Sequence, residues 1–328
     1  MAAGIILEPG TLWPRLLDRT VRALKTGALQ PIPTEHELVE HCGIRFLVRV
    51  LANLERKDED KTNRAEQKRK TGKDFNPFLP YEENLFVAEL SETHLCLLNK
   101  FNVVEHHLLI VTRQYEDQEN LLTRQDFEAL LAGLAEYEGL AFYNGGVIAG
   151  ASQRHKHLQL VPLPLVPGGA GTPIDPVLST AEFRNNAGGE CTGTIPAFPF
   201  VHAFARLDPD WTRFPSDAAG EALALYMTML RAAGLQACSA GAWRDEADPG
   251  RSAAGNGNAP LRQSGPYNLL ATREWMLLVP REREFYEGIS LNSLGFAGAL
   301  LVRNAQQMAM LRKRGPMAAL ESTAVRRP

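Results

Sequence analysis

Three short apolar segments, separated by connectors of turn length, constrain the fold of this chain more than any other feature. They are "LFVAEL" (85–90), "HLCLLN" (94–99) and "HLLIVT" (107–112). Strands joined by connectors this short pair with their sequence neighbours, so the segments predict an antiparallel meander. Residues 123–140, "TRQDFEALLAGLAEYEGL", follow directly and predict a helix that opens with a capping box from Thr123 to Asp126.

The same periodicity arguments place further helices and strands along the chain. They predict helices at 11–28, 217–233 and 292–314, strands at 141–145 and 157–163, and a hairpin from 267–272 and 275–280. The first helix is expected to bury an apolar stripe formed by Trp13, Leu16, Leu17, Val21 and Leu24. Helices and strands do not alternate regularly, which favours an α+β fold with a mostly antiparallel sheet flanked by helices. Neither a Rossmann nor a P-loop glycine motif occurs where a strand would lead into a helix.

Charge and cysteine content exclude several classes of protein. The net charge of −3 gives no global basic field that would recruit nucleic acid. The four cysteines are scattered, without a CxxC pair, so a disulfide framework or zinc knuckle is not expected and a reducing compartment fits better. No segment has the length of a membrane span or the pattern of a signal peptide. We therefore expect a cytoplasmic protein with no membrane partner.

The stretch "GASQRHKHLQL", residues 150–160, carries the densest polar chemistry. On a strand, His155, His157 and Gln159 would share one face, with Lys156 on the other. The small residues "AGAS" before them let backbone N–H groups approach a ligand closely and form an anion-binding nest.

Three interpretations of the two histidines stay open from the residues alone. A metal site needs three or four ligands, and no nearby Asp, Glu or Cys completes the set. A second interpretation is a pair of polar side chains satisfied inside a sheet. The third is nucleophilic catalysis on phosphorus, because imidazole is largely neutral near pH 7 and can attack without a separate base.

The motif resembles the His-x-His-x-Gln signature of the HIT superfamily's transferase branch, and more closely that of the ATP adenylyltransferases, also called diadenosine tetraphosphate phosphorylases. Segments in the order of that family surround it across about residues 45–310: "DFNPFLPYEENLFV", "LLNKFNVVEHHLLIVT", "FYNGGVIAGASQRHKHLQ" and "YNLLATREWMLLVPR" with "GISLNSLGFAGALLVRN" after it. The resemblance implies a HIT-like α+β fold and a single adenylyltransferase unit over residues 1–328, with a catalytic portion at about 75–165 and a C-terminal portion at about 215–315.

The resemblance also implies an activity: reversible phosphorolysis of diadenosine tetraphosphate to ATP and ADP through a covalent AMP-histidine. His157 would be the nucleophile, His155 would assist it, and Gln159 would donate its amide to a non-bridging oxygen. The phosphate chain would lie against Gly150, Ala151, Ser152 and Gln153. The partners would be small nucleotides and phosphate, without a protein-bound cofactor or metal. A divalent cation, Mg²⁺ or Mn²⁺, would accompany the polyphosphate substrate.

Further substrate-binding positions follow from the matching segments. Asn99 and Lys100 would contact nucleotide or polyphosphate, Asn144 the α-phosphate or ribose, and either Lys57 or Lys73 the distal phosphates. The remaining candidates, for adenosine or the far phosphates, are Thr272, Arg273, Met276 and Arg281. His107 matches a histidine of the family. The pair Gln153-Arg154 departs from it, because proline is common there in relatives.

Two alternative functions remain at this point. One is a hexose-1-phosphate nucleotidylyltransferase, which has the same His-x-His-x-Gln motif. The other is a non-catalytic protein that binds or senses nucleotides. Gln159 stands where the hydrolases of the superfamily have a third histidine, and a neutral amide cannot act as an acid or base. This favours transfer to phosphate over hydrolysis. The sequence does not fix the oligomeric state.

Overall fold

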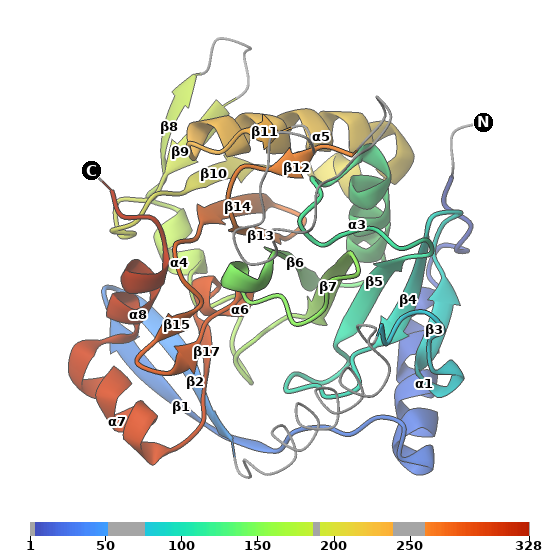
Figure 1. Ribbon diagram of the computed structural model, residues 1–328, viewed down its shortest axis with the longest axis horizontal. Helices are drawn as coiled ribbons and strands as arrows, with labels where there is room; N and C mark the ends of the chain where they lie inside the picture. The colour runs from blue at the N-terminus through green and yellow to red at the C-terminus, as the bar shows by residue number, and fades with distance from the viewer. Residues whose placement is uncertain (1–3, 52–75, 186–190, 239–259, 328) are drawn as a thin grey trace, which may run out of the picture.

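A ten-stranded sheet runs through the centre of the chain (Figure 1). The computed structural model describes residues 4–51, 76–185, 191–238 and 260–327. The strand order is β3-β4-β5-β7-β6-β13-β14-β10-β9-β8, and every neighbouring pair is antiparallel. The expected α+β fold with a mostly antiparallel sheet is therefore confirmed.

The strands of the large sheet are β3 (Phe86–Glu89), β4 (His94–Leu98), β5 (Leu108–Thr112), β6 (Gly139–Gly145), β7 (His157–Pro162), β8 (Glu182–Asn185), β9 (Cys191–Thr194), β10 (Ala203–Arg206), β13 (Tyr267–Ala271) and β14 (Trp275–Pro280). A second sheet combines β1 (Thr34–His41), β2 (Ile44–Leu51) and β17 (Ala299–Val302). Two small hairpins are β11 (Ala237–Cys238) with β12 (Arg262–Gln263), and β15 (Phe285–Tyr286) with β16 (Ile289–Ser290).

The helices surround these sheets. The α-helices are α1 (Leu12–Thr26), α3 (Arg124–Glu136), α4 (Asp175–Leu178), α5 (Pro215–Ala232), α6 (Ser293–Phe296), α7 (Ala305–Arg314) and α8 (Pro316–Thr323). The short 3₁₀ helices are η1 (Glu83–Leu85), η2 (Val147–Ala149) and η3 (Pro209–Thr212). Among the helices described, none is long and apolar enough to cross a membrane.

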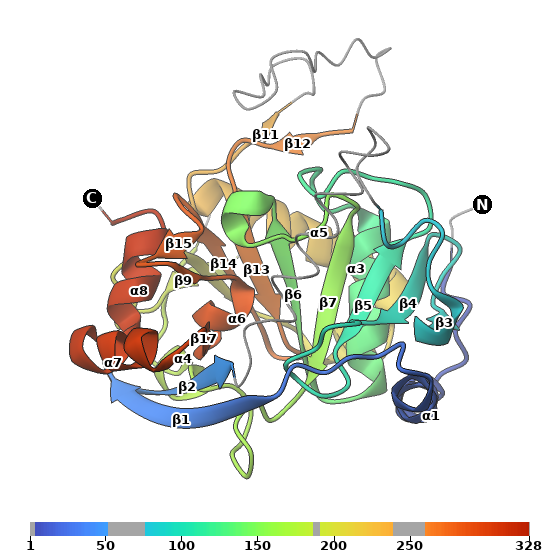
Figure 2. The same cartoon turned by 60° about the horizontal axis from the view of Figure 1, so that its bottom comes forward.

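The two faces of the large sheet are covered differently. Helices α3 and α5 pack on one face and enclose the largest core, to which β7 contributes Leu158 and Leu160. On the other face, the β1-β2-β17 sheet and α6 to α8 cover one half over a second core, and a small cluster around Phe78 covers β4 and β5. Figure 2 shows α3 and α5 behind the central strands, with β1, β2 and α6 on the near side. The ends of β6 and β7 that carry Asn144 and His157 contribute to neither of these two clusters.

The capping box predicted for α3 is confirmed. The Thr123 N–H donates to Asp126 Oδ2 over 2.7 Å, and the Asp126 N–H donates back to Thr123 Oγ1 over 3.3 Å. This exchange satisfies two backbone donors that the first turn of a helix otherwise leaves free. Asp126 is 2% exposed, so the same carboxylate is also available to the interior of the protein.

The single helix predicted at 292–314 is wrong. The structure divides this segment into α6, β17 and α7. The break falls at Gly298, which has φ +89° and packs so tightly that a Cβ would lie 2.5 Å from Pro173. Glycine tolerates this left-handed backbone, and the chain leaves it as a strand parallel to β2. The β1-β2-β17 sheet was not predicted, because β17 pairs with a strand about 250 residues earlier in the chain.

The apolar stripe predicted for the first helix is also wrong in part. Leu16 is buried, but Leu17, Val21 and Leu24 are 37%, 51% and 47% exposed. The face that packs against η1 and β3 instead carries Leu12, Leu16, Thr20 and Ala23. Thr20 can be buried there because its hydroxyl donates to the carbonyl of Leu16, so the polar group keeps a partner.

Candidate active site

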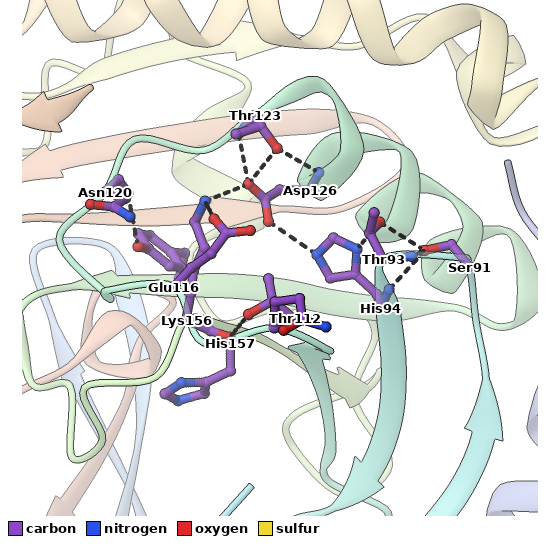
Figure 3. Close-up of polar contacts among 12 residues, drawn as sticks. Ser91, Thr93, His94, Thr112, Glu116, Asn120, Thr123, Asp126, Lys156 and His157 are labelled. Atoms are coloured by element: carbon purple, nitrogen blue, oxygen red, sulfur yellow. Dashed lines mark hydrogen bonds and ion pairs between the residues drawn. The ribbon is translucent and has the colours of Figure 1, made fainter. Parts of the chain in front are cut away.

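His157 lies at the first residue of β7, on the face of the sheet away from α3 and α5. Its strand neighbour is Val111 of β5, a member of the small cluster around Phe78. Because strand side chains alternate, Lys156 points to the opposite face, toward α3. Figure 3 shows the two side chains leaving the backbone on opposite sides.

The hydrogen bonds of His157 define which ring nitrogen carries the proton. Nδ1 lies 2.8 Å from the carbonyl oxygen of His155, and a carbonyl can only accept, so Nδ1 carries the hydrogen. Nε2 then has a lone pair, and it bonds to no residue that the structure describes. Burial lowers the pKa of His157 to about 4, so the ring is neutral at physiological pH. The arrangement is that of an imidazole held ready for attack through Nε2.

His155 uses both of its ring nitrogens within the protein. Nε2–H donates to the carbonyls of Thr112, at 2.8 Å, and Gln114, at 3.1 Å. Nδ1 accepts from the Asn76 amide nitrogen over 3.1 Å. Burial lowers the pKa of His155. His155 therefore has no free nitrogen for a phosphate. The help that His155 can give to His157 is to orient its ring, which it does through its backbone carbonyl.

Gln159 follows His157 on the same face of β7 and is tied to His107. The His107 Nε2–H donates to Gln159 Oε1 over 3.0 Å, while His107 Nδ1 lies 3.2 Å from the Asn99 amide nitrogen. Burial lowers the pKa of His107 to about 4, which keeps its ring neutral. With its oxygen engaged, Gln159 presents its amide N–H groups as donors beside His157. Asn99 and His107 thus reach the site through Gln159.

The side chain of Asn144, near the end of β6, is fixed through its amide oxygen, while its amide nitrogen bonds to no described residue. Its Oδ1 accepts from Asn268 Nδ2 at 2.8 Å, Ser293 N at 3.0 Å and Ser293 Oγ at 2.7 Å. Its Nδ2 bonds to no described residue, so it is a second donor on this face. Behind Asn268, Arg281 donates to Asn268 Oδ1 over 2.5 Å and is 2% exposed. Arg281 thus supports Asn144 from a buried position.

The small-residue turn before His155 offers fewer free N–H groups than expected. The Gly150 N–H donates to Val147 and the Ala151 N–H to Gly146, both inside the turn. The N–H groups of Ser152 and Gln153 bond to no residue in the described part of the chain. Gly150 itself has φ +90° and packs against the Leu291 carbonyl, where a Cβ would lie 3.0 Å from the oxygen. Of the four backbone N–H groups expected to bind an anion, only those of Ser152 and Gln153 are therefore available.

The structure does not bring every predicted substrate residue to His157. Thr272 and Arg273 lie in the β13–β14 turn, at the far end of the sheet, and Arg273 donates to the Leu134 and Ala135 carbonyls. Met276 faces the helix-covered core and is 1% exposed. Lys100 is half-exposed and paired with Glu82. The other two lysines, Lys57 and Lys73, lie outside the described residues.

A buried ionic network stands directly behind the nucleophile (Figure 3). Lys156 Nζ lies 2.7 Å from Asp126 Oδ2 and 2.9 Å from Glu116 Oε2, and Asp126 Oδ1 also contacts His94 at 3.0 Å. Burial alone would lower the pKa of Lys156, but the two carboxylates raise it. Burial opposes ionisation of Asp126 as well, yet Lys156 and His94 hold its pKa well below the usual value. Both groups are therefore charged, and they tether the start of β7 to α3.

Several residues that build the site were not predicted. Asn76 and Phe78 fall within the segment "DFNPFLPYEENLFV", where the family resemblance was a signal. Phe78 packs on both imidazoles, with ring centroids 5.3 Å from His157 and 5.6 Å from His155. Ser293 likewise lies in the matching segment at 288–304. Gln118 lies outside every matching segment and had no sequence signal, since it acts through contacts with distant segments. In the described part of the chain, no group of three His, Cys, Asp or Glu side chains could hold a metal ion.

Two family models match the chain in succession. The N-terminal domain of Ap4A phosphorylase matches residues 2–180, and the C-terminal domain of ATP adenylyltransferase matches residues 196–326. Two curated proteins of Saccharomyces cerevisiae are similar to the chain. Diadenosine 5',5'''-P1,P4-tetraphosphate phosphorylase 2 is 26% identical over 320 residues, 90% of this chain and 88% of that protein. Protein APA1 is 28% identical over 242 residues, 69% and 67% respectively.

Solved structures of yeast Ap4A phosphorylase Apa2 share the fold. The crystal structure of that protein aligns with a TM-score of 0.72 at 22% identity, covering 97% of this chain and 95% of the other. Its complex with Ap4A gives a TM-score of 0.72 at 20% identity, covering 97% and 98%. The likeness spans both halves of the chain.

Proposed function

The chain belongs to the family of Ap4A phosphorylases and ATP adenylyltransferases, and from this premise we propose that it splits diadenosine tetraphosphate with inorganic phosphate into ATP and ADP, reversibly. The observation that carries the proposal is the state of His157. Its imidazole is buried and neutral, Nδ1–H is fixed by a carbonyl, and Nε2 is free. The yeast relative named as a diadenosine tetraphosphate phosphorylase supports the choice of substrate.

In the first step, Nε2 of His157 attacks the α-phosphorus of one adenosine. A P–N bond forms as the bond between the α-phosphorus and the bridging oxygen breaks, and ATP leaves with the electron pair of that bond. The imidazole retains its Nδ1 proton, so the ring becomes positively charged. The His155 carbonyl, which already accepts a hydrogen bond from Nδ1–H, stabilises the charge without any movement. The leaving polyphosphate is stable as an anion, so a strong general acid is less necessary.

Charge that accumulates on the non-bridging oxygens needs donors already in place. The Gln159 amide, oriented by His107, lies two residues after the nucleophile and therefore on the same face of β7. Asn144 offers Nδ2 from the neighbouring strand, and Ser152 and Gln153 offer backbone N–H groups. These donors belong to three different segments. A free imidazole nitrogen that shares its face of the sheet with the Gln159 and Asn144 amides favours phosphoryl chemistry over metal binding.

In the second step, inorganic phosphate attacks the AMP-histidine and leaves as ADP. The P–N bond breaks, its electron pair returns to Nε2, and His157 is again neutral. Two displacements at one site predict ping-pong kinetics. A divalent cation, Mg²⁺ or Mn²⁺, would enter with the polyphosphate as part of the substrate. Cys42, Cys96 and Cys238 are free thiols, which supports the cytoplasm as the compartment.

The test is transfer of radiolabelled AMP to the protein. Wild-type enzyme incubated with adenosine-labelled diadenosine tetraphosphate should retain label after denaturation in alkali, and added phosphate should release it as ADP. The His157→Ala variant should bind the dinucleotide but retain no label. Wild-type protein that binds nucleotide without ever becoming labelled would instead be a sensor. Release of label by glucose 1-phosphate rather than phosphate would identify a hexose-1-phosphate nucleotidylyltransferase.

A second variant tests the choice between phosphate and water. Gln159→His places an ionisable ring where the superfamily's hydrolases have one. We expect this variant to release AMP in the absence of phosphate, because an imidazole can take the proton of an attacking water. If its turnover remains entirely phosphate-dependent, Gln159 does not determine the acceptor.

A further inference from the structure

The side chain of Gln118 lies between the ends of β6 and β7. Its Oε1 accepts from the backbone N–H of His157 at 2.9 Å. Its Nε2 donates to the carbonyl of Asn144 at 3.0 Å and to that of His157 at 3.2 Å. Both atoms of the amide therefore bond to main chain, and only one orientation of the amide satisfies all three contacts.

These contacts occur where the ladder between the two strands stops. The register of β6 with β7 runs from Gly139 opposite Pro162 to Phe142 opposite Gln159 and goes no further. Two residues beyond that pair, the backbones of Asn144 and His157 are joined through the Gln118 amide. A side chain thus takes the place of strand pairing at the position from which both site side chains emerge.

Gln118 is itself fixed at both backbone groups. Its N–H donates to the Arg154 carbonyl over 2.8 Å, and its carbonyl accepts from the Tyr143 hydroxyl. The side chain is 2% exposed, so solvent does not compete for its hydrogen bonds. An amide held in this way acts as a rigid spacer between the two strand ends.

We propose that Gln118 is a positioning residue that sets the separation between the imidazole of His157 and the amide of Asn144, and thereby the rate at which AMP is transferred to His157. The inference rests on the proposed function and extends it to a residue that does not touch the substrate. A nucleophile must stand within about 3–3.5 Å of the reacting atom, and a displacement of about 1 Å can lower the rate about 100-fold. Nucleotide binding, which involves more of the surface, should depend on Gln118 much less.

Two substitutions separate positioning from simple stability. Gln118→Met keeps the length of the side chain but removes all three hydrogen bonds. We expect single-turnover labelling of His157 to slow about 100-fold, with little change in the concentration of dinucleotide that gives half the maximal rate. The matched control is Met229→Ala, on α5 behind the opposite face of the sheet. It creates a cavity and destabilises the protein comparably, but should leave the labelling rate unchanged.

Gln118→Glu adds a second measurement, the pH dependence of the labelling rate, which would not change if Gln118 had a purely structural role. A neutral carboxyl donates one hydrogen bond and accepts another, so it keeps the His157 N–H contact and one carbonyl contact. An ionised carboxylate can only accept and would face two carbonyls. Burial raises the pKa of a carboxyl, so labelling by this variant should be near normal in acid and fall as the pH rises. The charged groups of this region lie in ion pairs, Lys156 with Asp126 and both Arg154 and Arg262 with Asp117, and they are the same in wild type and variant.

The outcomes distinguish this inference from the function on which it rests. If wild-type protein is never labelled, the proposed function and the role of Gln118 both fail. If wild-type protein is labelled and Gln118→Met is labelled at the same rate, only the positioning role is overturned. The same conclusion holds if the rate of Gln118→Glu follows the wild-type pH profile, with circular dichroism showing both proteins folded at each pH.

Discussion

Acidification to about pH 5.5 should leave the transfer of AMP to His157 almost unchanged. Burial lowers the pKa of this imidazole to about 4. A ring with that pKa is about 97% neutral at about pH 5.5, whereas one with the ordinary pKa of about 6.5 is about 9% neutral. Since only the neutral ring has a free lone pair, the two cases differ about tenfold in rate.

The assay is a single turnover with enzyme in excess over labelled diadenosine tetraphosphate, stopped in alkali because phosphorus–nitrogen bonds are labile in acid. This substrate has no terminal phosphate, so none of its phosphates titrates near neutral pH. The rate of labelling then reports the state of the enzyme alone. Circular dichroism at each pH must show a folded protein, because protonation of buried histidines also destabilises the native state.

The Phe78→Ala variant is the matched perturbation. The Phe78 ring packs on His157 with centroids 5.3 Å apart, and its removal admits water to the imidazole. Solvation should return the pKa of His157 toward its ordinary value, so the acid limb should shift upward by about one unit or more. A wild-type inflection near pH 6.5 would refute the argument that burial keeps the nucleophile neutral. Identical limbs in the two proteins would show that Phe78 does not shield it.

Three further predictions concern stability, each measured by urea unfolding. Lys156→Met should cost about 3–5 kcal/mol by leaving the carboxylate of Asp126 buried without its main partner, and a loss below about 1 kcal/mol would contradict that pairing. Gly150→Ala should cost about 1–3 kcal/mol, because alanine at φ +90° is strained and its Cβ would press on the Leu291 carbonyl; a neutral result would show that the loop yields. Burial lowers the pKa of His202 to about 4, so the unfolded state binds the proton first, and His202 contributes up to about 3 kcal/mol to the loss of stability between about pH 6.5 and 4. His202→Gln should remove that share of the slope and leave the shares of His107 and His157; an unchanged slope would contradict the burial of a neutral His202.

Elements of the fold that depend on local sequence were predictable. The meander β3-β4-β5 and the capping box of α3 follow from strand spacing and from residues three positions apart. The hairpin β13–β14 follows in the same way. The second sheet did not, because the apolar run at 299–302 has no local feature that separates a strand from a helix. Its conformation is decided by β2, which pairs with it in parallel from the other end of the chain.

The site residues, too, were predictable where local sequence determines their position and not where distant contacts do. The nucleophile and Gln159 lie on one strand, and period-two alternation was enough to place them together. The expected nest at Gly150 and Ala151 was partly wrong in its donors, because turn formation uses those N–H groups internally. Thr272, Arg273 and Met276 match a family segment, but segment-level similarity does not say which face or which end of a hairpin a residue occupies. Register and hydrogen bonding decide that.

The alternation that places His157 on the face away from α3 and α5 also explains why a lysine stands beside it. A slip of β7 by one residue would move His157 into the helix-covered core and Lys156 onto the face away from the helices. In the observed register, Lys156 reaches Asp126 at the start of α3. A slip would leave the buried Asp126 carboxylate without its positively charged partner. The ion pair between Lys156 and Asp126 therefore makes the slipped register unfavourable, and it acts at the residue next to the nucleophile. Gln118 holds the same backbone at the edge that faces β6, so β7 is constrained both from one face and from one edge at the point where the imidazole must not move.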